Sequence, residues 1–79
     1  MTKANQKIKT MELINSGIHR IQLAYDMPHL DRADLEVDTL IKQSWLLEII
    51  SKAERDFLEV KAMDAYYTKK NELEKGKED

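Results

Sequence analysis

The sequence contains no cysteine, and among its 79 residues it has only one proline and two glycines. Without cysteine the chain has no disulfide, no thiolate nucleophile and no cysteine ligand for a metal. Neither glycine nor proline occurs between His29 and Lys75, and that stretch consists mostly of good helix formers. We therefore expect an all-α protein.

Long apolar segments are also missing. No run approaches the ~18 residues of a membrane span, and the first ten residues are polar and lysine-bearing, unlike a signal peptide. We expect a cytoplasmic protein without a membrane span. A single domain of this length buries only about 60% of its unfolded surface. Because disulfides cannot add stability, we expect a homo-oligomer.

Charge is distributed unevenly, although the net charge is only −2. Residues 1–25 carry one acidic residue, Glu12, against Lys3, Lys7, Lys9 and Arg20. Residues 26–38 carry one basic residue, Arg32, against Asp26, Asp31, Asp34, Glu36 and Asp38. This pattern favours complementarity between neighbouring helices or subunits, and steering toward a charged partner is the alternative.

The first part of the chain has a clear helical period. Apolar residues recur at spacings of three and four: Ile8, Met11, Ile14, Ile18, Ile21 and Tyr25. The pattern predicts a helix over about 3–26 with a coiled-coil-like seam. Gly17 lies on one flank of the seam, where it can serve as a packing notch. Since Pro28 disfavours helix in the residue before it, we expect a turn at 27–31.

The next helix is predicted to start at Arg32, with Asp31 as its cap. Its first apolar face contains Ala33, Val37, Leu40 and Ile41, and a later stripe contains Leu46, Ile50, Ala53, Phe57, Val60 and Tyr67. On one straight helix the two stripes would lie on nearly opposite sides. Either the helix over about 32–43 breaks near 43–45, with Ser44 capping a further helix over about 45–73, or it continues. A break gives a three-helix bundle, and continuity gives a helical hairpin with a long C-terminal helix. We expect a frayed tail at 74–79.

No residue pattern indicates catalysis, a cofactor or a metal site. His19 and His29 are ten residues apart, whereas zinc ligands are closely spaced. We expect a surface His19 and a His29 that forms a hydrogen bond within its turn. The acidic segment lacks the glycine and the alternating oxygen ligands of a calcium loop. No serine lies in a glycine-rich elbow, and no phosphate-binding loop is present.

Protein recognition is the function that the residues favour. Aromatic side chains concentrate interface energy, although they can also cover small cores. Tyr66 and Tyr67 are adjacent on a helix, so one of them must face outward. The predicted partner-binding residues are Trp45, Tyr66, Tyr67, Asp31, Asp34 and Asp38. The predicted oligomer seam contains Ile14, Ile18, Ile21, Ile50, Phe57 and Val60.

The predicted function is a non-enzymatic protein–protein interaction module, an adaptor, chaperone or inhibitor that self-associates through helical seams. The alternative is a nucleic-acid-associated regulator that uses the lysines and the arginine of the first helix. We disfavour nucleic acid as a partner because the later helices alternate acidic and basic residues and so offer no continuous basic stripe.

Overall fold

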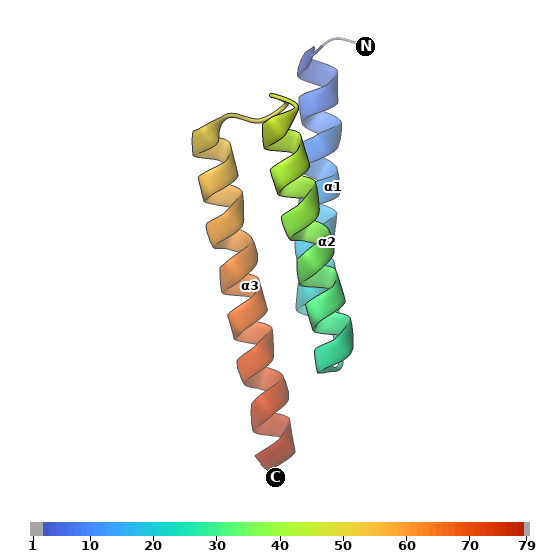
Figure 1. The fold of residues 1–79 in the computed structure, drawn as a ribbon. Coiled ribbons are helices and arrows are strands. Elements are labelled where there is room, and N and C mark those ends of the chain that lie inside the picture. Colours follow the sequence, from blue (N-terminus) through green and yellow to red (C-terminus); the bar gives the residue numbers. More distant parts are fainter. Residues whose placement is uncertain (1–2, 79) are drawn as a thin grey trace.

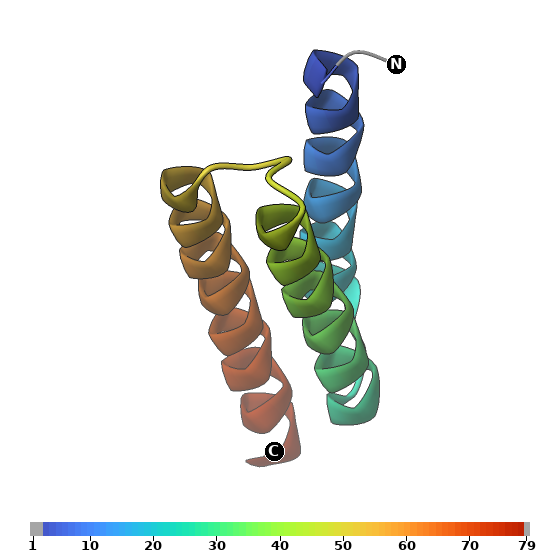
Figure 2. The same ribbon diagram turned by 45° about the horizontal axis from the view of Figure 1, so that its top comes forward.

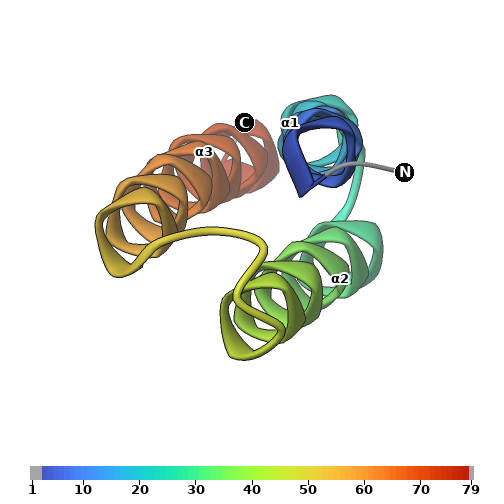
Figure 3. The same ribbon diagram turned by 90° about the horizontal axis from the view of Figure 1, so that it is seen from above.

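The computed structural model describes residues 3–78, and the side chains of residues 4–76. It contains three helices, α1 (Lys3–Leu23), α2 (Met27–Leu46) and α3 (Lys52–Glu78), and no strand within the described residues. Successive helices run in opposite directions (Figure 1), and each helix contacts the other two (Figure 3). The prediction of an all-α fold is confirmed, and of the two predicted architectures the chain forms the three-helix bundle.

The core lies along the axis of the bundle, and all three helices contribute to it. Its buried apolar residues are Ile14, Ile18, Ile21, Ala24, Leu30, Val37, Ile41, Ile50, Leu58, Ala62 and Ala65. In α1 the buried Ile14, Ile18 and Ile21 follow the predicted helical period, whereas Ile8 and Tyr25 of the predicted seam are exposed. In α2 the buried Val37 and Ile41 belong to the predicted apolar face. At Gly17 the two helices approach so closely that a Cβ atom there would lie 2.5 Å from Cγ2 of Val37. The predicted packing notch is therefore confirmed.

The turn between α1 and α2 falls earlier than predicted. The predicted turn at 27–31 is wrong, because α2 begins at Met27 and its N-cap is Asp26 rather than Asp31. Pro28 lies in the first turn of α2, where its missing N–H needs no partner and its fixed φ suits the helix. The proline therefore marks the start of α2, and α1 ends at Leu23, before the predicted residue 26.

The chain does break between the predicted second and third helices, but at 47–51 rather than at 43–45. Ser44 is no cap: it is buried within α2, and its hydroxyl donates to the carbonyl oxygen of Leu40 at 2.7 Å. The N–H of Ile49 donates to the Ser44 oxygen at 2.9 Å, and the N–H of Glu48 to the Trp45 oxygen at 3.0 Å. With φ 60° at Glu48, these bonds form a Schellman motif that ends α2.

Ser51 starts α3 through a capping box. Its hydroxyl accepts from the N–H of Glu54 at 3.2 Å, while the Glu54 carboxylate accepts from the N–H of Ser51 at 2.8 Å. Figure 2 shows this connection at the end of the bundle where α1 begins. The predicted tail is helical through Glu78, and Asp79 lies outside the described residues.

The apolar stripe predicted for the last helix is largely wrong. The side of α3 that faces the core contains Leu58, Ala62 and Ala65, whereas Phe57 and Val60 are about two-thirds exposed. The chain leaves the helix at 47–51, so residues before and after this connection do not share one helical face. The predicted stripe, which includes residues on both sides of the connection, therefore does not form. The small alanines let α3 lie close to the other helices.

Candidate functional site

A groove of about 450 Å³ runs between α2 and α3. Its lining residues are Asp34, Asp38, Ile41, Lys42, Glu59, Ala62, Met63, Tyr66 and Tyr67. Because α2 and α3 are antiparallel neighbours, the first half of α2 lies beside the middle of α3 (Figure 1). The fold thus brings together four of the six predicted partner-binding residues, two aspartates from α2 and two tyrosines from α3.

One end of the groove is aromatic. The Tyr66 hydroxyl donates to Oδ1 of Asp31 at 2.9 Å, which joins α3 to the first turns of α2 and brings in a fifth predicted residue. This bond, with burial second, raises the pKa of Tyr66. The ring of Tyr67 meets that of Tyr66 edge-on, with centroids 5.3 Å apart, and stays about half exposed. The expectation that one of these tyrosines faces outward is confirmed.

The groove carries more negative than positive charge. Asp34, Asp38 and Glu59 contribute three carboxylates, and Lys42 contributes the ammonium group among the lining residues. Lys42 is already engaged, since its Nζ lies 2.9 Å from Oδ2 of Asp38. The hydrogen bond to Asp38, followed by the charge of that carboxylate, raises the pKa of Lys42.

Asp34 is the unusual carboxylate of the groove. Burial raises its pKa, and the negative charges of Asp38 and Asp31 raise it further. Among the side chains of residues 4–76, no hydrogen-bond donor or cation pairs with the Asp34 carboxylate. A partly desolvated charge without a partner is unfavourable. An external cation would remove that cost.

Trp45 lies apart from the groove, near the C-terminal end of α2. It is 37% exposed, and the guanidinium carbon of Arg55 stands 4.2 Å from the centroid of its ring. This cation–π contact ties α3 to the end of α2. Of the six predicted partner-binding residues, Trp45 is the one that the fold places elsewhere.

The predicted oligomer seam is divided between two environments. Ile14, Ile18, Ile21 and Ile50 are buried in the core of the single chain, so their burial requires no second copy. Phe57 and Val60 face outward and remain available to another chain. The seam as predicted is not one continuous surface, because four of its residues point toward the bundle axis.

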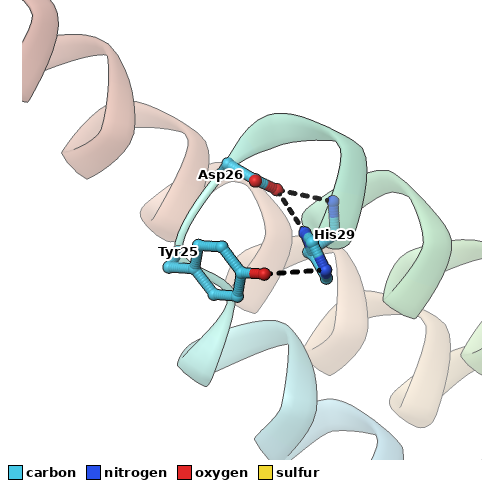
Figure 4. Close-up of polar contacts among 3 residues, drawn as sticks. All are labelled: Tyr25, Asp26 and His29. Atoms are coloured by element: carbon cyan, nitrogen blue, oxygen red, sulfur yellow. Dashed lines mark hydrogen bonds and ion pairs between the residues drawn. The ribbon is translucent and has the colours of Figure 1, made fainter.

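A second polar cluster lies at the α1–α2 turn (Figure 4). Oδ1 of Asp26 accepts from the backbone N–H of His29 at 2.9 Å and lies 2.6 Å from Nδ1 of the ring, and the Tyr25 hydroxyl is 3.0 Å from Nε2. The backbone bond, and then the ring contact, lowers the pKa of Asp26. The predicted hydrogen bond of His29 is confirmed.

The Asp–His–Tyr order resembles a proton relay, but the cluster is better explained as a helix cap. All three side chains are substantially exposed to water, which weakens any electrostatic activation. The contact between Asp26 and the N–H of His29 is the N-cap bond of α2. We therefore assign this cluster a structural role.

The basic residues of α1 are partly neutralised within the chain. Nζ of Lys7 lies 2.6 Å from Oε2 of Glu54 on α3, and the Arg20 guanidinium lies 3.5 Å from Glu36 on α2. The Arg20–Glu36 contact joins the basic segment to the acidic one and supports complementarity between helices, whereas Glu54 lies outside the acidic segment. The side chain of Lys3 lies outside the described part of the chain.

The described residues contain no group of three or more His, Cys, Asp or Glu placed to hold a metal ion. Within the same residues, no helix combines the length and apolarity needed to cross a membrane.

Sequence reasoning did not assign five lining residues to the site, Ile41, Lys42, Glu59, Ala62 and Met63. Lys42 follows Asp38 by four residues, a spacing that indicates an ion pair on a helix, so Lys42 could have been found from the sequence. Glu59 and Met63 share a helical face with Tyr66, but nothing in the sequence sets that face against α2. Comparison of the chain with protein-family models, curated proteins and solved structures finds no match.

Proposed function

We propose that this chain is a cytoplasmic, non-enzymatic protein-interaction module that self-associates and acts as an adaptor, chaperone or inhibitor. In this proposal the α2–α3 groove receives a basic side chain of a partner protein. The observation that carries it is the Asp34 carboxylate, which is partly desolvated, lacks a cation partner and lies in an acidic groove beside exposed tyrosine.

Arginine fits this chemistry better than lysine. A guanidinium group is planar, donates two parallel hydrogen bonds to a carboxylate and stacks on aromatic rings, while an ammonium group is a strongly hydrated point charge. Asp34 would supply the carboxylate, the Tyr67 ring the stacking surface, and Met63 an apolar contact for the methylene stem. Binding in a half-enclosed groove strengthens the charge pair relative to bulk water.

The surroundings of Asp34 also support a binding role for this carboxylate. Its charged form opposes folding, since burial and two neighbouring carboxylates disfavour it. A carboxylate kept at such a position is a candidate for binding, because function often requires groups that do not stabilise the fold.

The nucleic-acid alternative receives less support. Lys7 and Arg20, two of the four basic residues on which it depends, already contact carboxylates of the same chain. Nuclease-sensitive binding that falls steeply with salt would favour the alternative.

The proposal is tested by capturing partners from a nuclease-treated cell lysate on the immobilised protein, followed by mass spectrometry. The isosteric variant Asp34→Asn should lose the partner, whereas Glu12→Gln, which removes an exposed charge on α1, should retain it. Equal recovery on both variants would contradict a role for the groove. As a direct measurement, N-acetylarginine methylamide should shift the amide resonances around Asp34 and Tyr67 more than the lysine analogue does.

A further inference from the structure

The outer face of α3 carries an apolar stripe that no other part of the described chain covers. Phe57, Val60, Met63 and Tyr67 are spaced by three, three and four residues, and each is 53–66% exposed. They lie opposite the buried face of the helix, which contains Leu58. Contiguous exposed apolar side chains of this kind mark interaction surfaces.

We infer that this stripe packs against the same stripe of a second copy, with the two α3 helices antiparallel. The inference rests on the self-association in the proposed function. It adds which face of α3 forms the contact and in which direction the two helices run. The four positions are nearly symmetric about residue 62. A two-fold axis there places Phe57 opposite Tyr67 of the other copy, and Val60 opposite Met63. Two-fold dimers, in which one patch meets itself, are the commonest oligomers.

The charges beside the stripe favour the antiparallel direction. Lys61 and Asp64 are both exposed and lie along the same edge of α3, and Nζ of Lys61 also donates to Oδ1 of Asn15 on α1 at 3.2 Å. An antiparallel dimer sets Lys61 of each copy near Asp64 of the other, so the two-fold axis creates two opposite-charge contacts. A parallel two-fold dimer would set this edge against the opposite edge of the stripe on the other copy, so Lys61 and Asp64 of the two copies would not meet.

The stripe is short, which limits the affinity. It spans about 15 Å of helix at roughly 1.5 Å per residue, whereas standard interfaces bury about 800 Å² on each partner. We therefore expect a dimer that dissociates in the micromolar range. Met63 and Tyr67 also line the α2–α3 groove, so dimer formation and a bound partner would compete for these two side chains.

Sedimentation equilibrium over a range of concentrations tests the interface. The wild-type chain should approach twice the monomer mass, and Val60→Asp should weaken the dimer at least tenfold. Because Val60 is exposed, the variant should keep its helical circular dichroism. Leu13→Asp is the matched control, since this residue is similarly exposed but lies on α1. A monomer at every concentration, or an unchanged mass for Val60→Asp, would overturn the inference.

Disulfide trapping tests the direction, and the lack of native cysteine makes its result unambiguous. Ala53 and Asn71 are exposed and lie about 27 Å apart on α3. In the antiparallel dimer Ala53 faces Asn71 of the other copy. A mixture of Ala53→Cys and Asn71→Cys chains should form the mixed disulfide, and neither variant should cross-link alone. Self-linking of Ala53→Cys would indicate a parallel pair and overturn the inference.

The two proposals fail separately. Asp34 lies outside the stripe, so Asp34→Asn should leave the dimer mass unchanged. A monomer that still captures a partner through Asp34 would overturn the dimer while supporting the groove. The opposite outcome is a mixed disulfide together with equal partner capture by the wild type and Asp34→Asn. That outcome would support the dimer and contradict the groove as the binding site.

Discussion

At the residue scale, Gly17 sets the distance between α1 and α2. A methyl group there would meet Val37, whose β-branched side chain has little rotamer freedom. Glycine is a poor helix former, by about 1 kcal/mol relative to alanine. Its presence in the middle of α1 is explained by this close approach rather than by a turn.

We predict that Gly17→Ala destabilises the protein by about 1–2 kcal/mol, because overpacking a core outweighs the gain in helix propensity. The matched control is Gly76→Ala, also in a helix, where an added Cβ meets nothing within 4 Å. That variant should be neutral or slightly more stable. Urea unfolding measures both, and a stabilising effect of Gly17→Ala would mean that Val37 moves aside without cost.

Asp34 gives a pH-dependent prediction at the same scale. Its pKa is raised above the ordinary value of 3.8, mainly by burial and then by Asp38 and Asp31. The folded state therefore binds a proton at Asp34 more tightly than the unfolded state does. The charged form opposes folding at neutral pH, and this penalty disappears as the pH falls through the raised pKa toward 3.8.

We expect Asp34→Asn to be more stable than the wild type at pH 7, with an advantage that vanishes as the pH falls toward 3.8. Comparing the two proteins at each pH cancels the effects of other groups, such as Asp26 and Glu54, whose pKa values are lowered. The variant should be more stable and yet bind its partner less well. A loss of stability at pH 7 would show that the Asp34 carboxylate is satisfied within the chain.

At the scale of elements, the connection between α2 and α3 depends on an unusual residue. Glu48 has φ 60°, in the left-handed region, which costs a residue other than glycine about 1–2 kcal/mol. Its N–H and that of Ile49 complete the Schellman motif that ends α2. Glycine is the residue that this position favours.

We therefore predict that Glu48→Gly stabilises the protein by up to about 1 kcal/mol, since the relief of strain exceeds the added flexibility of the unfolded chain. Glu48→Ala is the control, because alanine removes the carboxylate but keeps the steric conflict, and it should give no such gain. Thermal unfolding distinguishes them. If Glu48→Gly and Glu48→Ala have equal unfolding temperatures, any change in stability comes from the lost charge and not from relief of backbone strain.

The same connection explains which elements could be predicted from the sequence. Within α1 and the middle of α2, the spacing of apolar residues identified Ile14, Ile18 and Val37 as core, since the helix carries its period along without interruption. No residue type signals a left-handed turn at Glu48, so the rotation of α3 after it could not be derived. Ser51 and Glu54 did contain a start signal, the capping box, and Asp26 before Pro28 contained another.

At the scale of the whole molecule, the positions of Ile18 and Val60 separate folding from association. Ile18 is 3% exposed and Val60 is 66% exposed. A carboxylate buried without a partner costs several kcal/mol, a large part of the about 4–12 kcal/mol expected for a domain of this length. We predict that Ile18→Asp unfolds the chain, while Val60→Asp remains helical by circular dichroism. A folded Ile18→Asp protein would place this side chain outside the core.

Some of the residues that line the groove could be singled out from the sequence, but their arrangement could not. Asp34, Asp38, Tyr66 and Tyr67 were identified from charge and aromatic character alone. Their meeting in one groove depends on how α3 returns along α2, which the turns decide. Trp45 shows the same limit, because its aromatic character was evident but its partner Arg55 was not.

The short connections at 24–26 and 47–51 also determine how the chain reaches its native state. Each helix is followed at once by the antiparallel neighbour on which it packs, so many contacts join residues close in sequence. Chains of low contact order cross their folding barrier in microseconds to milliseconds. The protein should therefore refold within milliseconds after dilution from denaturant, and a newly synthesised chain would expose its apolar core only briefly.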